Sequence, residues 1–194
     1  MGVFMEKNRF ILFDRDGVIN IEKSYLYKIE DFEYESGVIE GLEKLKKLGY
    51  RFLIITNQAG IARGYYTEED YLKLEKFITE DLKNKGIKIE KTYYCPHHPE
   101  GKENYGIECD CRKPNTGNFL KAIEEFQIDV KKSFMIGDRI TDLIPAEKLG
   151  FKTVLVKTGY GMKNISKLAD NGLKSLVVGS ISEFGDFLKE NSAM

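Results

Sequence analysis

Short apolar runs alternate along the chain with longer segments in which apolar and polar residues recur at helical spacing. Within residues 38–48, for example, every third or fourth residue from Ile39 to Leu48 is apolar. This alternation is typical of βαβ units, so we expect an α/β fold with a doubly wound parallel sheet. The predicted strands span residues 9–13, 51–56, 91–94, 133–136, 153–156 and, at a sheet edge, 175–178, and the predicted helices span 38–48, 67–84, 117–126 and 143–149.

Two long stretches, residues 20–36 and 95–116, fit neither helix nor strand. The first is polar and aromatic, and the second contains all three cysteines and both histidines. Long loops in a compact domain are usually functional or organised by a metal. Both follow strands of a parallel sheet, so we expect them at the edge where α/β proteins bind their ligands.

Length and charge narrow the classes of function. The 194 residues are enough for one α/β domain, and we expect a single domain over 1–194 with its core over 9–160. The 30 basic and 31 acidic side chains leave a net charge of −1, which provides no overall basic surface for nucleic acid or anionic lipid. The N-terminal residues show no signal-peptide pattern and no apolar run is long enough to span a membrane, so we expect a cytoplasmic monomer without nucleic-acid or membrane partners.

The first predicted strand runs directly into two aspartates, Asp14 and Asp16, which are followed by Gly17. Two carboxylates at the end of a buried strand repel each other and lose hydration, so they do not favour stability. A divalent cation would relieve this repulsion, and Gly17 lets the backbone turn so that a main-chain carbonyl can face the cation. The alternative interpretation is a polar strand end with a type I turn.

Three further polar segments favour the first interpretation. The second strand ends at Thr56, which offers a hydroxyl of the kind that phosphate oxygens require. Arg112 and Lys113 follow the cysteine-containing loop and put two cations close together. A second acidic pair, Asp138 and Asp142, follows the fourth strand. Together with the first pair, these segments predict a site for a phosphate group and a divalent cation.

In this order, the motifs resemble those of the haloacid dehalogenase superfamily of phosphotransferases. The resemblance implies a Rossmann-like haloacid dehalogenase core and a magnesium-dependent phosphoric monoester hydrolase. It also implies an aspartyl-phosphate on Asp14, with Asp16 as the acid for the leaving oxygen and then the base for water. By the same resemblance, Thr56 and Lys113 hold phosphoryl oxygens, Asp14, Asp16 and Asp138 hold Mg²⁺, and Asp142 orients Asp138 or a water molecule.

The loop over residues 95–111 predicts a second metal site. Three cysteines and a histidine pair lie within it, and three thiolates with one imidazole match a closed tetrahedral Zn²⁺ site. A closed site has no open position for catalysis, so we expect the zinc to be structural and to fix the segment that carries Arg112 and Lys113. Unligated thiols beside a chance histidine pair are the alternative. Disulfides are disfavoured by the odd number of cysteines and the expected compartment.

Four motifs are more specific than those that define the superfamily. They are Asp-Arg-Asp-Gly-Val-Ile-Asn, Thr-Asn-Gln-Ala-Gly-Ile-Ala-Arg-Gly, Cys-Pro-His-His-Pro and Cys-Asp-Cys-Arg-Lys-Pro. Over residues 10–159 they resemble D-glycero-D-manno-heptose 1,7-bisphosphate 7-phosphatases. This resemblance implies removal of the 7-phosphate in nucleotide-activated heptose biosynthesis, and a Cys-x-His pattern that favours His97 over His98. It implies zinc ligation by Cys95, His97, Cys109 and Cys111, and substrate contacts from Glu22, Lys23, Ser24, Tyr25, Asn57, Gln58, Ala59, Arg112 and Arg139.

The spacing of the motifs predicts a capless enzyme. About 40 residues separate Asp16 from Thr56, which leaves no room for a cap domain, so loops must select the substrate. Arg63, Arg112 and Arg139 are candidates for a second phosphate. Ala59 and Arg139 stand where the resembled family commonly has Ser and Lys, and Arg139 can bind bidentately where a lysine cannot. Histidinol-phosphate phosphatase is the nearest alternative activity, and a non-catalytic zinc-binding interaction module is the alternative of a different class.

Overall fold

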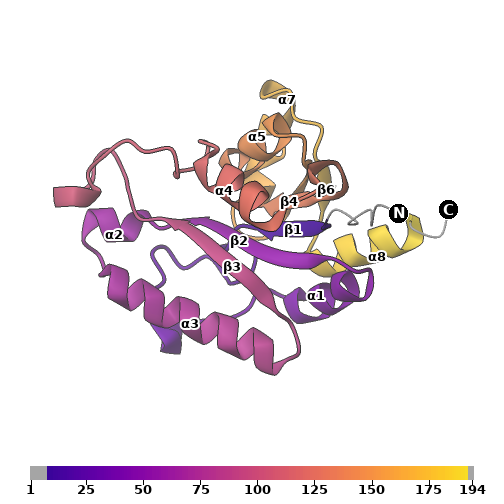
Figure 1. The fold of residues 1–194 in the computed structure, drawn as a ribbon, viewed down its shortest axis with the longest axis horizontal. Helices are drawn as coiled ribbons and strands as arrows, with labels where there is room; N and C mark the ends of the chain where they lie inside the picture. The colour runs from indigo at the N-terminus through magenta and orange to yellow at the C-terminus, as the bar shows by residue number, and fades with distance from the viewer. Residues whose placement is uncertain (1–7, 192–194) are drawn as a thin grey trace, which may run out of the picture.

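The computed structural model describes residues 8–191 and confirms the α/β fold (Figure 1). Six parallel strands form one sheet in the order β3-β2-β1-β4-β5-β6. Each predicted strand is present to within a few residues, and the edge strand is β6. Residues 1–7, in which we expect no signal peptide, lie outside the described part. The strands are β1 (Phe10–Phe13), β2 (Arg51–Asn57), β3 (Ile89–Cys95), β4 (Phe134–Gly137), β5 (Lys152–Val156) and β6 (Leu176–Val178).

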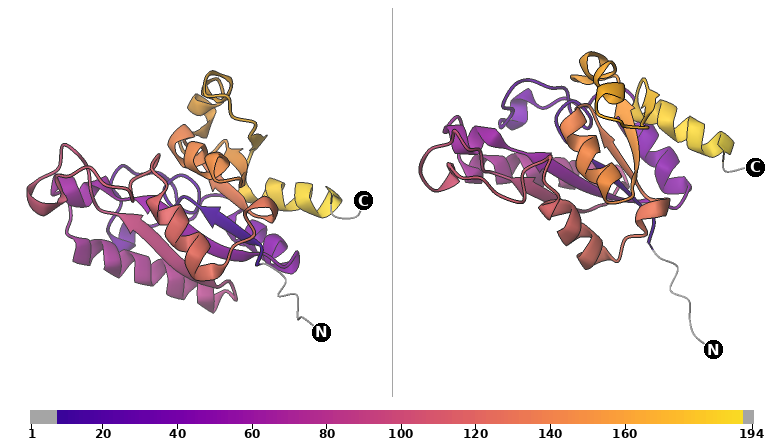
Figure 2. Two further views of the ribbon diagram at one scale, coloured as in Figure 1. Left: turned by 45° about the horizontal axis from the view of Figure 1, so that its top comes forward. Right: turned by 90° about the horizontal axis from the view of Figure 1, so that it is seen from above.

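Helices cover both faces of the sheet, as a doubly wound fold requires (Figures 1 and 2). Successive side chains of β1 point to opposite faces of the sheet, and both faces are apolar. Ile11 and Phe13 belong to one buried cluster, and Phe10 and Leu12 belong to another. The first cluster packs against α1, α3 and α8, and the second packs against α4 and α5. These helices are α1 (Val38–Lys47), α3 (Glu68–Asn84), α4 (Gly117–Phe126), α5 (Ile140–Lys148) and α8 (Ile181–Asn191).

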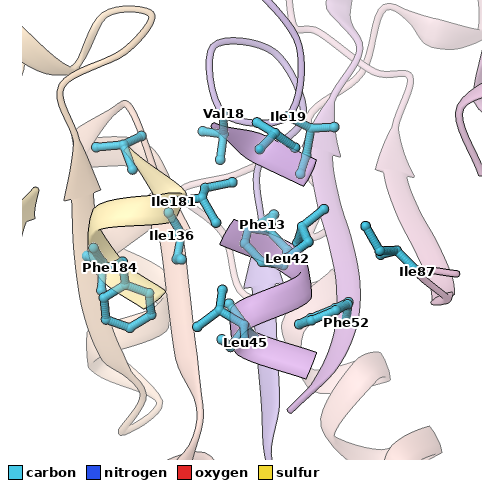
Figure 3. Packing of buried hydrophobic residues seen from close by; sticks show 14 of the residues in the cluster. Phe13, Val18, Ile19, Leu42, Leu45, Phe52, Ile87, Ile136, Ile181 and Phe184 are labelled. Carbon is cyan, nitrogen blue, oxygen red and sulfur yellow. The ribbon is translucent and has the colours of Figure 1, made fainter. Parts of the chain in front are cut away.

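The first cluster includes a helix that the sequence analysis did not identify. In Figure 3, Phe184 of α8 lies in the same layer of side chains as Leu45 of α1. The two helices approach closely at Gly41, where a Cβ atom would come within 2.6 Å of the main chain at Ile181. A glycine inside a helix is therefore explained here by helix–helix contact. The apolar residues of α8 recur at helical spacing, which is the signal that was overlooked.

Helix α5 begins earlier than the sequence pattern predicts. Its N-cap is Arg139, whose main-chain N–H donates to Asp142 Oδ2 at 3.0 Å. Because the helix starts at Ile140, Pro145 lies in the second turn, where proline removes one helical hydrogen bond. The remaining short helices are α2 (Ala59–Arg63), α6 (Gly161–Asn164), α7 (Lys167–Asp170), η1 (Ile29–Asp31), η2 (Glu103–Tyr105) and η3 (Val130–Lys132).

The strand order reverses between β1 and β4, and this position determines where a ligand can bind. Phe13 pairs in register with Ile54 of β2 and with Ile136 of β4, so the three strands reach their carboxyl ends side by side. Open α/β sheets bind ligands at such a reversal. Among the helices that the structure describes, none has the length and apolar character needed to cross a lipid bilayer.

Candidate active site and metal-binding loop

Asp14 and Lys113 form a buried ion pair at the carboxyl end of β1. Lys113 Nζ lies 2.9 Å from Asp14 Oδ1 and 2.8 Å from Asp142 Oδ1. It also donates a hydrogen bond to the carbonyl of Ile55 at 2.7 Å. Burial alone would lower the pKa of Lys113, but Asp14 and Asp142 outweigh this effect and raise the pKa. The structure thus joins the acid of the first strand to the lysine that follows the cysteine-containing loop.

Two further carboxylates reach this position from β4 and α5. One oxygen each of Asp14, Asp138 and Asp142 lies within 4.8 Å of the others, and all three residues are buried. Asp138 Oδ1 has no hydrogen-bond partner among residues 8–191, although Arg139 Nε lies 3.9 Å away. Buried polar atoms are normally partnered, and carboxylate oxygens are the ligands that Mg²⁺ prefers. The three carboxylates therefore fit a divalent cation.

The negative charges of the buried carboxylate cluster are unfavourable, because the carboxylates lose hydration and repel one another. Burial raises the pKa of Asp14 to about 6, with Lys113 opposing the shift and Asp142 adding to it. Burial, together with Asp142 and Asp14, raises the pKa of Asp138 to about 8. A bound cation would favour the ionised carboxylates and reverse both shifts. The electrostatics of the site thus agree with its donor atoms.

Two glycines allow the strand ends to approach Asp138. At Gly17 the backbone has φ = +79°, and a Cβ atom there would collide with Asp138 Oδ2. A Cβ atom at Gly159, where φ is +52°, would collide with the same oxygen. The oxygen accepts a hydrogen bond from the main-chain N–H of Tyr160 at 2.7 Å. Side chains at either glycine would displace Asp138 from the cluster.

The carboxylate of Asp16 lies apart from the other three. Arg15 Nη2 donates to both of its oxygens, Asn20 Nδ2 donates to Oδ1 at 3.0 Å, and Gln58 Nε2 donates to Oδ2 at 2.9 Å. Burial alone would raise the pKa of Asp16, but Arg15 and these hydrogen bonds outweigh it and lower the pKa. Both carboxylate oxygens of Asp16 are therefore engaged by side chains of the protein.

The residues at the end of β2 hold their neighbours in place. Gln58 Nε2 donates to Thr56 Oγ1 at 2.9 Å, and Gln58 Oε1 accepts from Tyr66 at 2.7 Å. Asn57 forms hydrogen bonds with the main chain of Lys113. Thr56 is only 1 % exposed, and its hydroxyl accepts this hydrogen bond within the protein. The amides of Asn57 and Gln58, expected to contact substrate, are engaged within the protein.

One cleft of about 440 Å³ contains most of the predicted site residues. Three of the residues expected in the active site, Lys23, Thr56 and Asp138, do not line it. Lys23 Nζ instead donates to the carbonyl of Asp31 at 2.7 Å and to Glu33 Oε1 at 2.5 Å. The expected residues that line the cleft are Asp14, Asp16, Glu22, Ser24, Tyr25, Asn57, Gln58, Ala59, Arg63, Arg112, Lys113, Arg139 and Asp142. Four lining residues were not expected from the sequence: Tyr66, His98, Thr141 and Tyr160.

Two of the missed residues had a recognisable signal. Thr141 and Tyr160 each follow the carboxyl end of a strand, the same position that identified Asp138. A larger hollow of about 640 Å³ lies at the opposite edge of the sheet, beside Phe134 and Leu176. It contains neither of the two metal-binding groups found among the described residues, so the cleft at the carboxyl edge is the candidate active site.

Cations stand at the rim of the cleft. The guanidinium carbon of Arg139 lies 3.8 Å from the centre of the Tyr160 ring, and Nη2 lies 3.4 Å from Glu22 Oε2. Arg63 Nη2 lies 3.3 Å from His98 Nε2, and the buried Nε of Arg63 has no hydrogen-bond partner within the described residues. These side chains supply positive charge a short distance from the buried carboxylates, which suits an anionic substrate.

The loop over residues 95–111 brings three thiols and one imidazole together. His97 Nδ1 lies 3.3 Å from Cys111 Sγ, and Cys95 Sγ lies 3.5 Å from Cys109 Sγ. Tetrahedral zinc with Zn–S bonds of about 2.3 Å places its sulfur ligands about 3.8 Å apart, so these separations fit such a site. His98 lies outside the group, and its Nδ1 accepts from a main-chain N–H at 3.1 Å. The four grouped residues are Cys95, His97, Cys109 and Cys111, whose ligand atoms all lie within 4.8 Å of one another.

Known proteins with similar sequences agree with this geometry. A family model described as "HAD-hyrolase-like" matches residues 110–183. The D-glycero-beta-D-manno-heptose-1,7-bisphosphate 7-phosphatase of Pasteurella multocida is 42 % identical over 180 residues, which cover 92 % of this chain and 96 % of the relative. The D-glycero-alpha-D-manno-heptose-1,7-bisphosphate 7-phosphatase of Photorhabdus laumondii is 47 % identical over 156 residues, covering 79 % of this chain and 85 % of the relative.

Solved structures show the same architecture. The D,D-heptose 1,7-bisphosphate phosphatase of B. bronchiseptica, crystallised with magnesium and phosphate, superposes with a TM-score of 0.82 at 26 % identity. This match covers 94 % of this chain and 99 % of that one. The phosphatase of Burkholderia thailandensis gives a TM-score of 0.67 at 27 % identity, covering 93 % and 99 % of the two chains. The chain therefore belongs to the D-glycero-D-manno-heptose-1,7-bisphosphate 7-phosphatase family of haloacid dehalogenase-like hydrolases.

Proposed function

We propose that this chain is a magnesium-dependent phosphatase that hydrolyses the 7-phosphate of D-glycero-D-manno-heptose 1,7-bisphosphate. The observation that carries the proposal is the convergence of Asp14, Lys113, Asp138 and Asp142 at the carboxyl edge of the sheet, in a chain 42 % identical to such an enzyme. Phosphoryl transfer requires in-line positioning of the reactants and neutralisation of the phosphate charge. A buried lysine among carboxylates that can share a cation supplies both.

The protein's own residues would divide the reaction as follows. Asp14 would attack phosphorus and form an aspartyl-phosphate while the sugar oxygen departs. Asp16, which faces the same cleft, would give a proton to that oxygen and then take one from the water that hydrolyses the aspartyl-phosphate. Lys113 would offset the charge of the phosphoryl oxygens, because its ammonium group already contacts Asp14.

Two metals fit the two ligand groups. Asp14, Asp138 and the main chain of Asp16 would hold Mg²⁺, which when bound neutralises the carboxylates and the transferred phosphate. Asp142 would keep Lys113 in place through their ion pair of 2.8 Å. The four ligands of the loop over residues 95–111 would hold Zn²⁺ with no open position, which supports a structural role.

A bisphosphate also needs cations for its second phosphate. Arg63, Arg112 and Arg139 line the cleft, and each could bind a phosphate bidentately. Glu22, Ser24 and Tyr25 line the same cleft and are the candidates for contacts with the sugar.

The proposed function is tested by following hydrolysis with phosphorus NMR. The purified protein with Mg²⁺ should convert the α or β heptose 1,7-bisphosphate into free phosphate and a heptose that retains its 1-phosphate. Histidinol phosphate, assayed under the same conditions, should react far more slowly. Faster turnover of histidinol phosphate, or loss of the 1-phosphate, would contradict the proposed substrate, and no hydrolysis of any ester would contradict the proposed reaction.

A further inference from the structure

Arg15 has the largest of the completely buried side chains that the structure describes. Its Nη2 donates to the two oxygens of Asp16, at 2.9 and 3.0 Å, and to the carbonyl of Leu26 at 3.2 Å. Its Cζ lies 5.5 Å from the centre of the Tyr71 ring on α3. Moving a guanidinium out of water is costly, and an apolar side chain would fill the same space more favourably. The buried charge of Arg15 therefore requires a reason other than packing.

A second buried charge lies on α3, one helical turn beyond Tyr71, over whose ring the Arg15 guanidinium lies. Glu75 is 8 % exposed, and one of its oxygens accepts a hydrogen bond from Thr92. Within residues 8–191, the other oxygen of Glu75 has no hydrogen-bond partner, and neither do Nε and Nη1 of Arg15. Burial alone would lower the pKa of Arg15, but the charges of Asp16 and Glu75 outweigh it and raise the pKa. The guanidinium thus contacts one carboxylate, Asp16 in the cleft, and a second carboxylate, Glu75 on α3, acts on its charge from a longer distance.

We propose that Arg15 and Glu75 are positioning residues for Asp16, and that Glu75 acts on the reaction from outside the cleft through Arg15. The proposal rests on the acid role proposed above for Asp16. Arg15, Asn20 and Gln58 together confine its carboxylate, and 20 % of the side chain remains exposed.

Confinement matters because a proton donor must keep one geometry. A protonated carboxyl group that is free to rotate about its side-chain torsions would direct its proton at the leaving oxygen for only part of the time. Glu75 compensates the buried guanidinium and so keeps Arg15 where it can hold Asp16. Glu75 does not line the cleft, so it can influence turnover without contacting substrate.

Two substrates separate positioning from a merely structural role. The alkoxide of a sugar phosphate needs a proton to leave, whereas 4-nitrophenolate leaves without one. The ratio of kcat/KM for heptose bisphosphate to kcat/KM for 4-nitrophenyl phosphate therefore reports on proton donation. Both values come from one preparation, so the ratio is independent of the fraction of folded protein.

Arg15→Lys and Glu75→Gln are the informative variants. Arg15→Lys should lower kcat/KM for the bisphosphate about 10- to 100-fold and for 4-nitrophenyl phosphate by no more than about 3-fold. Glu75→Gln should change the ratio in the same direction by about 3- to 10-fold. Glu90→Gln is the matched control, because Glu90 is a partly buried carboxylate paired with Arg51 at 3.0 Å and lies outside the cleft. Its ratio should stay at the wild-type value.

Asp16→Asn distinguishes the failure of this inference from failure of the proposed function. It should give the largest change in the ratio, and an unchanged ratio would remove the acid role itself. Suppose that the ratio changes in Asp16→Asn, but that Arg15→Lys and Glu75→Gln each lower kcat/KM equally for both substrates. This result would overturn the positioning role and leave the acid role of Asp16 intact. If Arg15→Lys does not fold, Glu75→Gln decides by the same criterion.

Discussion

The side-chain amide of Asn57 forms two hydrogen bonds with the main chain of Lys113. Nδ2 donates to the Lys113 carbonyl, and Oδ1 accepts from the Lys113 N–H, both at 3.0 Å. Asn57 is the last residue of β2, whereas Lys113 lies in the loop that follows the cysteines. A strand in the middle of the sheet therefore fixes the position of the lysine relative to Asp14.

Replacing Asn57 by alanine should displace Lys113 and slow the reaction. Both main-chain groups of Lys113 lose their partners, and we expect kcat to fall about 10- to 100-fold, because small displacements of catalytic groups have effects of this size. Steady-state kinetics on the bisphosphate would measure the change. Asn171→Ala, which removes a side-chain hydrogen bond of 2.8 Å on the surface of α7, should leave kcat unchanged. A normal kcat in Asn57→Ala would show that Lys113 keeps its position without this contact.

Replacing Asp14 by asparagine should abolish turnover and leave the fold intact. The amide cannot attack phosphorus, and the change also removes one charge from a cluster that raises the pKa of Asp138. We therefore expect the melting temperature of the metal-free variant to equal or exceed that of the wild type. Residual activity above about one-hundredth of the wild-type value would argue against Asp14 as the nucleophile.

His97→Ala should lose zinc, whereas His98→Ala should retain it. The two histidines are adjacent, but only the first has its Nδ1 beside the thiols. Elemental analysis of wild-type protein purified under reducing conditions should give about one zinc per chain. The zinc-free variant should also lose activity, because Lys113 is only two residues beyond Cys111. Equal zinc contents in the two variants would exclude His97 as a ligand.

Stabilisation by Mg²⁺ should increase with pH. The pKa of Asp138 is raised from 3.8 to about 8, so between these values the folded protein binds more protons than the unfolded chain. The stability of the metal-free protein should accordingly fall as the pH rises through this range. Bound Mg²⁺ requires ionised carboxylates, so it should remove this loss of stability at higher pH.

The melting temperature, measured with and without Mg²⁺, tests this linkage. The difference should be larger at about pH 8.5 than at about pH 6, since at the lower pH bound protons compete with the metal. Asp138→Asn should show almost no difference at either pH. A shift of equal size at both pH values in the wild type would mean that Asp138 is already ionised without the metal.

The sequence predicts the centre of the site well because strand ends in a parallel sheet converge. Asp14, Thr56 and Asp138 each follow an apolar run, and the in-register pairing of β1 with β2 and β4 brings these ends together. The cluster of Cys95, His97, Cys109 and Cys111 is equally predictable, because three thiols and an imidazole within one short loop admit few interpretations other than a metal site.

The surroundings of the site depend on contacts between segments that no local pattern encodes. Lys23 follows the same motif as Glu22, yet Glu33 draws its side chain away from the cleft. Asp142 is expected to orient Asp138 or a water molecule, and its ion pair with Lys113 is a contact that the sequence does not predict. These pairings depend on which partner the tertiary fold places nearby, so no local sequence pattern predicts them.

The pairing of Phe13 with Ile54 and Ile136 has a further consequence. A single-residue insertion in any of these strands would rotate the following side chain to the other face of the sheet and remove it from the reaction. Loops at the rim of the cleft are under no such restriction, and they tolerate changes in length. Changes in the loops at the rim can therefore alter the sugar preference, while the residues at the strand ends that cleave the phosphate ester stay the same.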